Sequence, residues 1–253
     1  MIEDPVLLWS LVGTAAGTLL GIAGTGGGVI AIPILMAFGG YDIKEASAYS
    51  LLALSVGAAI SWFFQRKNTL YPVAAILILC ASIIAFITAP LKAISPDWLV
   101  NVLLNLTCLF SLYSLWVLRK PEDLGEIRPT IYRIKTASIG GAITGFLSTM
   151  TGLGGGVVII PWLTGITRLV FDQAMACSLL TIAVTAPLSA WRQGNINISA
   201  GSWVSLTVTL IIASFIVKKL TSPFSHFQMI LVRKLTLTGV IIVSMMRTLA
   251  VLF

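Results

Sequence analysis

The sequence has few charged residues and few side chains suited to metal or redox chemistry. Only 10% of the 253 residues are charged and there is a single histidine, whereas roughly a quarter of the residues of soluble domains carry charge. Cys80, Cys108 and Cys177 stand alone in apolar sequence, without the paired spacing of a zinc site or a disulfide framework. These shortages argue against a soluble enzyme, and we expect no bound metal and no cofactor.

Apolar residues dominate instead. They make up 57% of the chain, and the mean hydropathy is +1.00. At about 20 residues per crossing, the length allows roughly seven to nine helical elements. The apolar runs span residues 6–23, 29–38, 46–64, 70–89, 98–118, 137–150, 157–170, 174–191, 203–217 and 235–253. The first run follows no basic region of a secretory signal, so we expect it to stay in a multi-pass protein of the inner (plasma) membrane.

Two copies of one glycine-rich motif interrupt the apolar sequence. The first copy, Gly24-Thr25-Gly26-Gly27-Gly28, is followed by Pro33, and the second, Gly152-Leu153-Gly154-Gly155-Gly156, by Pro161. Because glycine frees the backbone and proline cannot donate a helical hydrogen bond, each motif predicts a broken helix. Paired breaks in the two halves of a membrane protein are typical of a transporter's binding site.

The two halves correspond at a constant offset of 128 residues, which maps residues 13–65 onto 141–193 without a gap. Among the identical pairs are Pro33 with Pro161, Ser50 with Ser178, and Gln65 with Gln193. The fold we predict is therefore all-α and polytopic, with two inverted repeats that each hold a glycine-broken helix unit and three transmembrane helices. The repeats are assigned to residues 1–118 and 136–253, joined by a linker at 119–135.

Basic residues in the loops predict the orientation. Arg66-Lys67, the 119–135 linker and the 218–234 stretch should face the cytoplasm by the positive-inside rule. If each two-limbed unit makes an even number of crossings, both termini lie outside. The net charge of +7 is thus explained largely by topology, and we expect no nucleic-acid partner.

Neither glycine motif fits a nucleotide-binding fingerprint, because Val29 and Val157 stand where a third spaced glycine is required. A nest of backbone amides at the start of a half-helix is the better interpretation, since free N–H groups and the helix dipole attract an anion. Two inverted copies would bring two such nests together near the membrane midplane. A purely structural role in kinking packed helices is the alternative.

The doubled Gly-x-Gly-Gly-Gly-x4-Pro-x-Leu motif and the Ala-x-Ala-x-Ser-Leu-Leu that follows it at Ala46 and Ala174 resemble the TauE/SafE sulfite exporter family, also called the toluene sulfonate uptake permeases. The resemblance covers nearly the whole chain. It implies a secondary transporter that exports a small sulfur oxyanion or organosulfonate, such as sulfite or sulfoacetate, and not an enzyme. It does not choose among these anions.

Side chains able to hold an oxyanion complete the predicted site. Gln65 and Gln193 can each donate two hydrogen bonds, and Arg192 can offer a bidentate fork. An interfacial glutamine or a snorkelling arginine is the competing interpretation. The predicted substrate-binding set is Gly24, Thr25, Gly26, Gly27, Gly28, Gln65, Gly152, Gly154, Gly155, Gly156, Arg192 and Gln193, with Ser50 and Ser178 as further candidates.

The mechanism follows from where the acids lie. All nine fall at termini, loops or helix ends, whereas proton-coupled pumps usually keep a carboxylate at the centre of a membrane helix. We expect export of a monoanion driven by the membrane potential, worth about 2.3 kcal/mol per 100 mV. Proton symport through the substrate itself, Glu45 or Asp172 is the alternative, and an anion channel is the rival function. Besides the anion and membrane lipid, the expected partner is a second copy in a homodimer.

Overall fold

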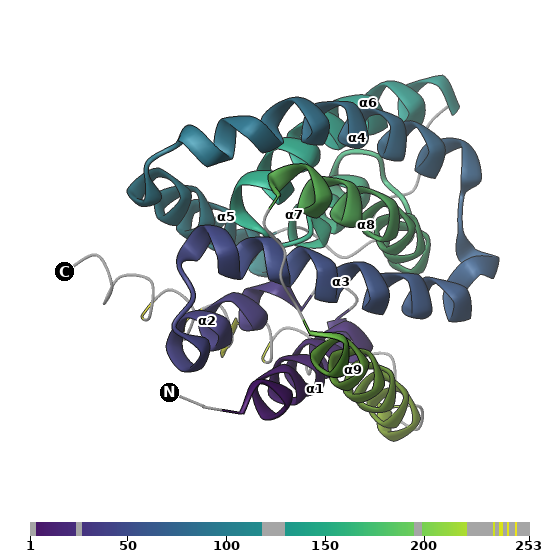
Figure 1. Cartoon of the computed structure of the whole chain (residues 1–253). Coiled ribbons are helices and arrows are strands. Elements are labelled where there is room, and N and C mark those ends of the chain that lie inside the picture. The colour runs from purple at the N-terminus through teal and green to yellow at the C-terminus, as the bar shows by residue number, and fades with distance from the viewer. Residues whose placement is uncertain are drawn as a thin grey trace.

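The computed structural model describes residues 4–23, 27–117, 130–194 and 199–221, together with five single positions between 235 and 246. In this part of the chain all regular structure is helical (Figure 1). The helices are α1 (Pro5–Ala23), α2 (Gly28–Gly39), α3 (Ile43–Gln65), α4 (Tyr71–Ile94), α5 (Asp97–Val117), α6 (Thr130–Thr151), α7 (Gly156–Gly165), α8 (Phe171–Gln193) and α9 (Ala200–Thr221), with one 3-10 turn at Arg66–Asn68.

Each described helix overlaps a predicted apolar run, and most ends agree to within four residues. The ends differ by more in α4, α6 and α7, and α7 ends at Gly165 although its run continues to residue 170. Helix α6 begins at Thr130, inside the predicted linker. Helix α4 continues through Pro90 to Ile94, although the apolar run ends at Ala89. Helix α3 begins directly after Asp42, whose side chain makes no capping hydrogen bond there. The last apolar run, 235–253, lies almost wholly outside the described residues.

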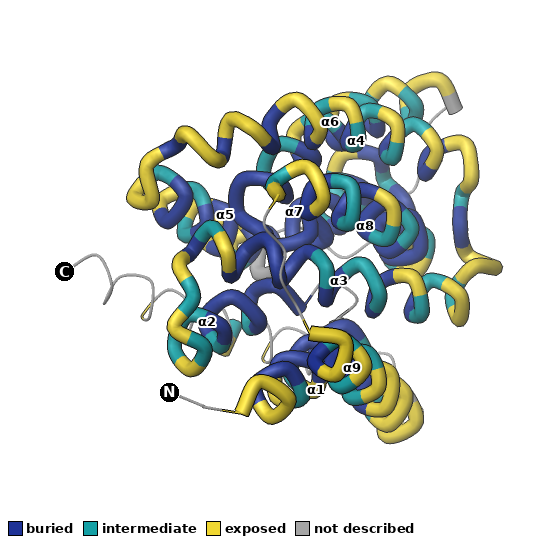
Figure 2. The backbone as a smooth tube through the Cα atoms, viewed as in Figure 1, coloured by how far each residue is buried: buried dark blue, intermediate teal, exposed yellow. Residues whose placement is uncertain are grey.

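Four described helices are long and apolar enough to cross a membrane: α3 with its 3-10 extension, α4, α8 and residues 200–217 of α9. Their outward faces are apolar as well. Leu79 and Ile87 on α4, for example, are each 61% exposed. Figure 2 shows buried backbone concentrated around α7 and the middle of α8, with exposed positions along the outer sides of α4 and α9. This distribution is that of a polytopic helical membrane protein, whose outer surface meets lipid.

Helices of the two duplicated halves pack against each other in corresponding pairs. Helix α1 packs against α9, and α6 packs against α4, at corresponding glycines. A Cβ atom on Gly17 would lie 2.6 Å from the Leu210 carbonyl oxygen in α9, and one on Gly145 would overlap the Ala81 carbonyl oxygen in α4. Gly17 and Gly145 differ by 128 positions, and Leu210 and Ala81 by 129. The first helix of each half's broken unit therefore packs on the helix that follows the central helix of the other half: α1 on α9, which follows α8, and α6 on α4, which follows α3.

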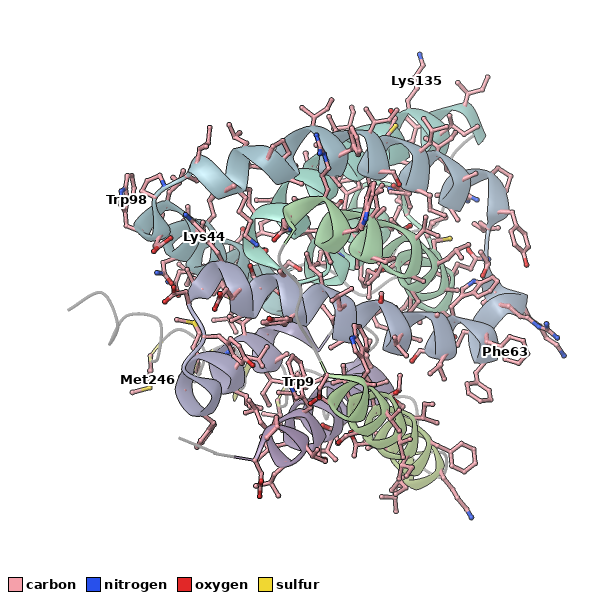
Figure 3. All side chains as sticks on the ribbon, in the orientation of Figure 1. Trp9, Lys44, Phe63, Trp98, Lys135 and Met246 are labelled. Atoms are coloured by element: carbon pink, nitrogen blue, oxygen red, sulfur yellow. The ribbon has the colours of Figure 1, made fainter. Side chains whose placement is uncertain are left out.

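Helices α3 and α8 occupy the centre of this arrangement and run antiparallel to each other (Figure 1). Ser47, near the start of α3, and Gln193, the last residue of α8, hydrogen bond to the same lysine on α4. The two ends of α3 are marked in Figure 3, where Lys44 lies on the opposite side of the molecule from Phe63. The glycine breaks pack against this central pair.

Candidate anion-binding site

A lysine is the largest fully buried side chain in the described part of the chain. Lys92 lies in the last turn of α4 and is 1% exposed. It continues the buried face formed by Ala81, Ala85 and Thr88, while Ile94 is 80% exposed. A lysine this close to a helix end could reach the surface with its flexible stem. Lys92 points into the protein instead.

The Lys92 ammonium is held by two neutral oxygens. It donates a hydrogen bond to Gln193 Oε1 on α8 at 2.8 Å and another to Ser47 Oγ on α3. Among the described residues the one salt bridge joins Lys44 to Asp97, at 3.2 Å, so no described carboxylate pairs with Lys92. Neutral acceptors compensate the cost of burying a charge poorly. The interior at this end of the central helix pair thus holds a lysine that no described carboxylate pairs with.

The second glycine motif forms a tight loop beside this lysine. Gly152, Gly154 and Gly155 have φ angles of +78°, +77° and +76°, in the left-handed region that side chains with a Cβ atom disfavour. A Cβ atom on Gly152 would also overlap Ser47, the residue that accepts from Lys92, and one on Gly154 would lie 2.7 Å from Leu54 Cδ1. The loop therefore lies directly against α3 and needs glycine for both its backbone angles and its close approach.

The loop leaves backbone donors unused. No hydrogen bond within the described residues uses the amides of Gly154, Gly155 or Gly156, which lead into the first turn of α7. The Ser148 hydroxyl is 5% exposed, has no partner in that part of the chain, and would lie 3.7 Å from a Cβ atom on Gly155. Amides at a helix start and a buried hydroxyl, all without a partner in the described part of the chain, form a group of donors suited to an oxyanion.

The two glycine motifs meet. A Cβ atom on Gly28 would lie 2.9 Å from the Gly152 carbonyl oxygen and 2.9 Å from Leu153 Cα. Gly27 is the N-cap of α2, whereas Gly24, Thr25 and Gly26 lie outside the described residues. Leu54 contacts both motifs, and it is the middle residue of α3. The breaks are thus brought together half-way along the central helix pair.

Comparison with known proteins identifies the family. A family model described as "Sulfite exporter TauE/SafE" matches residues 9–246. The chain belongs to the TauE/SafE family. A "Probable membrane transporter protein" of Methanocaldococcus jannaschii is 28% identical over 223 residues, which cover 83% of this chain and 80% of that protein. No solved structure matches. This TauE/SafE protein is therefore a multi-pass membrane transporter of the sulfite exporter type.

In the TauE/SafE protein the two candidate serines behave differently. The Ser50 hydroxyl donates to the Gly152 carbonyl oxygen at 3.0 Å and so supports the second break. Ser178, its counterpart in the other half, is fully buried, and its hydroxyl has no partner among the described residues. The residue that corresponds to Gly152 is Gly24, which lies outside those residues. Ser50 thus supports the glycine loop of the candidate site.

The two candidate glutamines lie at opposite ends of the central pair. Gln193 accepts from Lys92 and so belongs to a cluster of three residues from three helices, Ser47, Lys92 and Gln193. Its amide nitrogen also approaches the Thr149 carbonyl oxygen at 3.5 Å. Gln65 lies eighteen residues after Ser47 in α3, which is about 27 Å along the helix axis. Because α3 and α8 are antiparallel, equivalent positions near their ends, such as Gln65 and Gln193, are far apart. One small anion cannot touch both glutamines.

Arg192 points away from the cluster. Its side chain is exposed, and its guanidinium carbon lies 4.8 Å from the centre of the Phe86 ring, which is also exposed. This stacking is the geometry of a cation–π contact at the surface. The arrangement supports the interpretation of Arg192 as a snorkelling interfacial residue rather than a ligand.

The sequence did not predict Lys92 as a site residue. The apolar run ends before Pro90, so Lys92 lies outside every predicted helix. In the structure Pro90 lies inside α4, and the helix continues for four more residues. A signal was present: Ala81, Ala85, Thr88 and Lys92 keep helical spacing on one buried face. No group of three or more His, Cys, Asp or Glu comes together in the described ranges. The Lys92 ammonium and the amides of Gly154, Gly155 and Gly156 are instead hydrogen-bond donors, which suit an anion.

Proposed function

We propose that this TauE/SafE protein exports a small sulfur oxyanion or organosulfonate, such as sulfite or sulfoacetate, across the inner membrane. The observation that carries the proposal is the glycine loop at Gly152–Gly156. Its amides at Gly154–Gly156 have no partner among the described residues, and Gly152 packs against Ser47, which accepts a hydrogen bond from the buried Lys92 ammonium. Donors of this kind, held in a water-poor interior, favour an anion over a neutral or cationic solute. The family name supports the sulfur chemistry, and the geometry supports the charge of the substrate.

The proposed binding position is the meeting point of the two glycine breaks, near the membrane midplane. Leu54 and Ile182, the middle residues of α3 and α8, both lie close to Gly154. A Cβ atom on that glycine would be 2.7 Å from Leu54 Cδ1 and 3.6 Å from Ile182 Cγ2. If α3 and α8 span the bilayer, this point is half-way across it. The corresponding contacts of α1 with α9 and of α6 with α4 support the inverted repeat, in which each half packs against the other.

The proposed ligand set is narrower than the one expected from the sequence. It keeps the second glycine motif and Gln193, with Gly28 and Gly27 at the contact between the breaks and Ser50 as a support of the loop. Gln65 and Arg192 are left out because of their distance and exposure. Gly24, Thr25 and Gly26 remain members by their correspondence to the second motif.

Efflux from proteoliposomes tests this function. The full chain is reconstituted in vesicles loaded with sulfite or methanesulfonate, and a potassium diffusion potential, negative inside, is applied. We expect saturable anion efflux that accelerates with the potential and is absent from protein-free vesicles. Flux of neither anion would contradict the proposal. Efflux that is unaffected by the potential but requires a proton gradient would replace the potential-driven mechanism with proton symport.

The same preparation separates a carrier from an anion channel. Carriers bind and release one substrate per conformational cycle, so their flux saturates and is slow. A pore lined by the same glycine loops would give resolvable single-channel currents in planar bilayers. We expect no such currents.

A further inference from the structure

We propose that Lys92 is the residue whose charge holds the transported anion, and that it makes the site selective for monoanions. This inference rests on the proposed function and adds to it the residue that carries the positive charge and the charge class of the substrate. Its basis is the packing of α4 against α8 and the hydrogen bond that joins Lys92 to Ser47 of α3, because neither the duplicated motif nor the apolar pattern points to a lysine.

The first argument is the unfilled coordination of the ammonium. A lysine ammonium has three donors, and the described residues accept from two of them, through Ser47 Oγ and Gln193 Oε1. Ser47 Oγ itself donates to the Lys44 carbonyl oxygen at 2.8 Å. These contacts orient the ammonium between three helices. One donor and the net charge remain for a ligand.

The second argument is the position of the lysine next to the glycine loop. Ser47, which accepts from Lys92, is also the residue that Gly152 packs against. Ser50, one turn further along α3, donates to the Gly152 carbonyl oxygen at 3.0 Å. The ammonium and the loop thus share one wall, formed by the first turns of α3. An oxyanion near that wall can be reached from both sides.

The third argument concerns charge balance. The other charged groups at this end of the central pair are paired with each other or exposed: Lys44 with Asp97, and Asp42, Glu45 and Arg192 toward the surface. Exposed charges are screened by solvent, while a buried one is not. One negative charge would therefore neutralise the interior, and a dianion would leave an uncompensated charge there. Hydrogensulfite and simple sulfonates fit this requirement better than sulfate, thiosulfate or sulfoacetate.

A purely structural role for Lys92, tying α3, α4 and α8 together, makes a different prediction. If Lys92 only connects the helices, its loss should lower the thermal stability and leave the affinity for an anion unchanged. If Lys92 binds the anion, its loss should lower the affinity, and it should also remove an uncompensated buried charge. Affinity and melting temperature together therefore separate the two roles.

The test uses the purified full chain in detergent, with methanesulfonate as the monoanion and sulfate as the dianion, measured by calorimetry. We expect the wild type to bind methanesulfonate more tightly than sulfate. Lys92→Gln should weaken methanesulfonate binding at least about tenfold, the scale of a lost hydrogen bond to a charged group. Lys92→Arg should keep most of the affinity. Lys135→Gln is the matched control, because Lys135 is exposed on α6 and points outward in Figure 3.

Gln193→Glu gives an independent test that does not remove the lysine. The new carboxylate would take the place of an oxygen that lies 2.8 Å from the ammonium and form an internal ion pair. We expect a higher melting temperature and a loss of methanesulfonate binding of at least about tenfold, because the internal carboxylate competes with the ligand. This variant tests whether Lys92 binds the anion even if Lys92→Gln does not fold.

Methanesulfonate affinity within threefold of the wild type in Lys92→Gln, or in Gln193→Glu, would overturn the role of Lys92 while leaving the proposed function intact. Tighter binding of sulfate than of methanesulfonate by the wild type would overturn the selectivity for monoanions. Failure of the wild type to bind sulfite or any sulfonate would contradict the proposed function itself.

Discussion

The ammonium of Lys92, in the last turn of α4, donates a hydrogen bond of 2.8 Å to the side-chain carbonyl of Gln193, the last residue of α8. Gln193 has an identical counterpart in the other half, Gln65. Lys92 has none, because the corresponding position in α9 is Leu220 or Thr221, depending on whether the offset is 128 or 129. The helical framework is duplicated, but the positive charge is present once. Any anion site built on it is asymmetric.

Gly154→Ala should abolish transport and destabilise the protein by about 1 to 3 kcal/mol. The alanine Cβ atom would require a left-handed backbone at φ +77° and would meet Leu54 at 2.7 Å. Gly201→Ala is the control, since a Cβ atom there meets nothing within 4 Å. Efflux and thermal unfolding report the two effects. Normal transport by Gly154→Ala would show that the loop geometry is not needed.

Gly17→Val should lower the melting temperature without a specific loss of anion affinity in the protein that remains folded. The side chain would push α1 away from the Leu210 carbonyl oxygen, and overpacking of this kind costs about 1 to 3 kcal/mol. Gly145→Val should act similarly on α6 and α4. Unfolding in detergent, followed by tryptophan fluorescence, measures both, and unchanged stability in either variant would argue against the close helix contacts.

Gln193→Ala and Gln65→Ala should differ, although the residues are repeat equivalents. Gln193 orients Lys92 at the cluster, so its loss should weaken methanesulfonate binding by about 1 to 2 kcal/mol. Gln65 lies at the far end of α3 and should leave the affinity unchanged. Calorimetry on both variants gives the comparison. Equal losses would mean that the substrate contacts both ends of the central pair during binding.

Arg192→Gln should bind methanesulfonate within about twofold of the wild type, because the guanidinium stacks on Phe86 at the surface rather than facing Lys92. Arg192→Lys should behave in the same way. A large loss in Arg192→Lys, which keeps the charge but lacks the fork, would instead indicate bidentate contact with the anion.

Labelling of single cysteines should place Lys135 and Ile94 on opposite sides of the membrane. In a background without Cys80, Cys108 and Cys177, we expect an impermeant thiol reagent added outside the cell to modify Ile94→Cys and not Lys135→Cys. Ile94, the last residue of α4, is 80% exposed. Permeabilised cells control for reactivity. Labelling of Lys135→Cys in intact cells would reverse the predicted orientation.

Much of this architecture follows from local properties of the chain. Long apolar runs must form helices in a membrane, where unpaired backbone groups are too costly, so the helix positions were predictable to within a few residues. The glycine clusters predicted the break after α6 because only glycine adopts repeated positive φ angles cheaply. The prolines were less informative: Pro33, Pro90 and Pro161 lie inside helices. Because the predicted helix ended before Pro90, the buried Lys92 was left outside it.

The composition of the candidate site depended on contacts between distant segments. The correspondence of Gln65 and Gln193 in sequence suggested a shared role, but antiparallel packing of α3 on α8 sends equivalent residues to opposite ends. The same packing brings Ser47, Lys92 and Gln193 together from three helices. Sequence alone determined where the helices form and break, because those choices depend on neighbouring residues. Tertiary structure decided which polar groups share the interior, because that depends on how the two halves interlock.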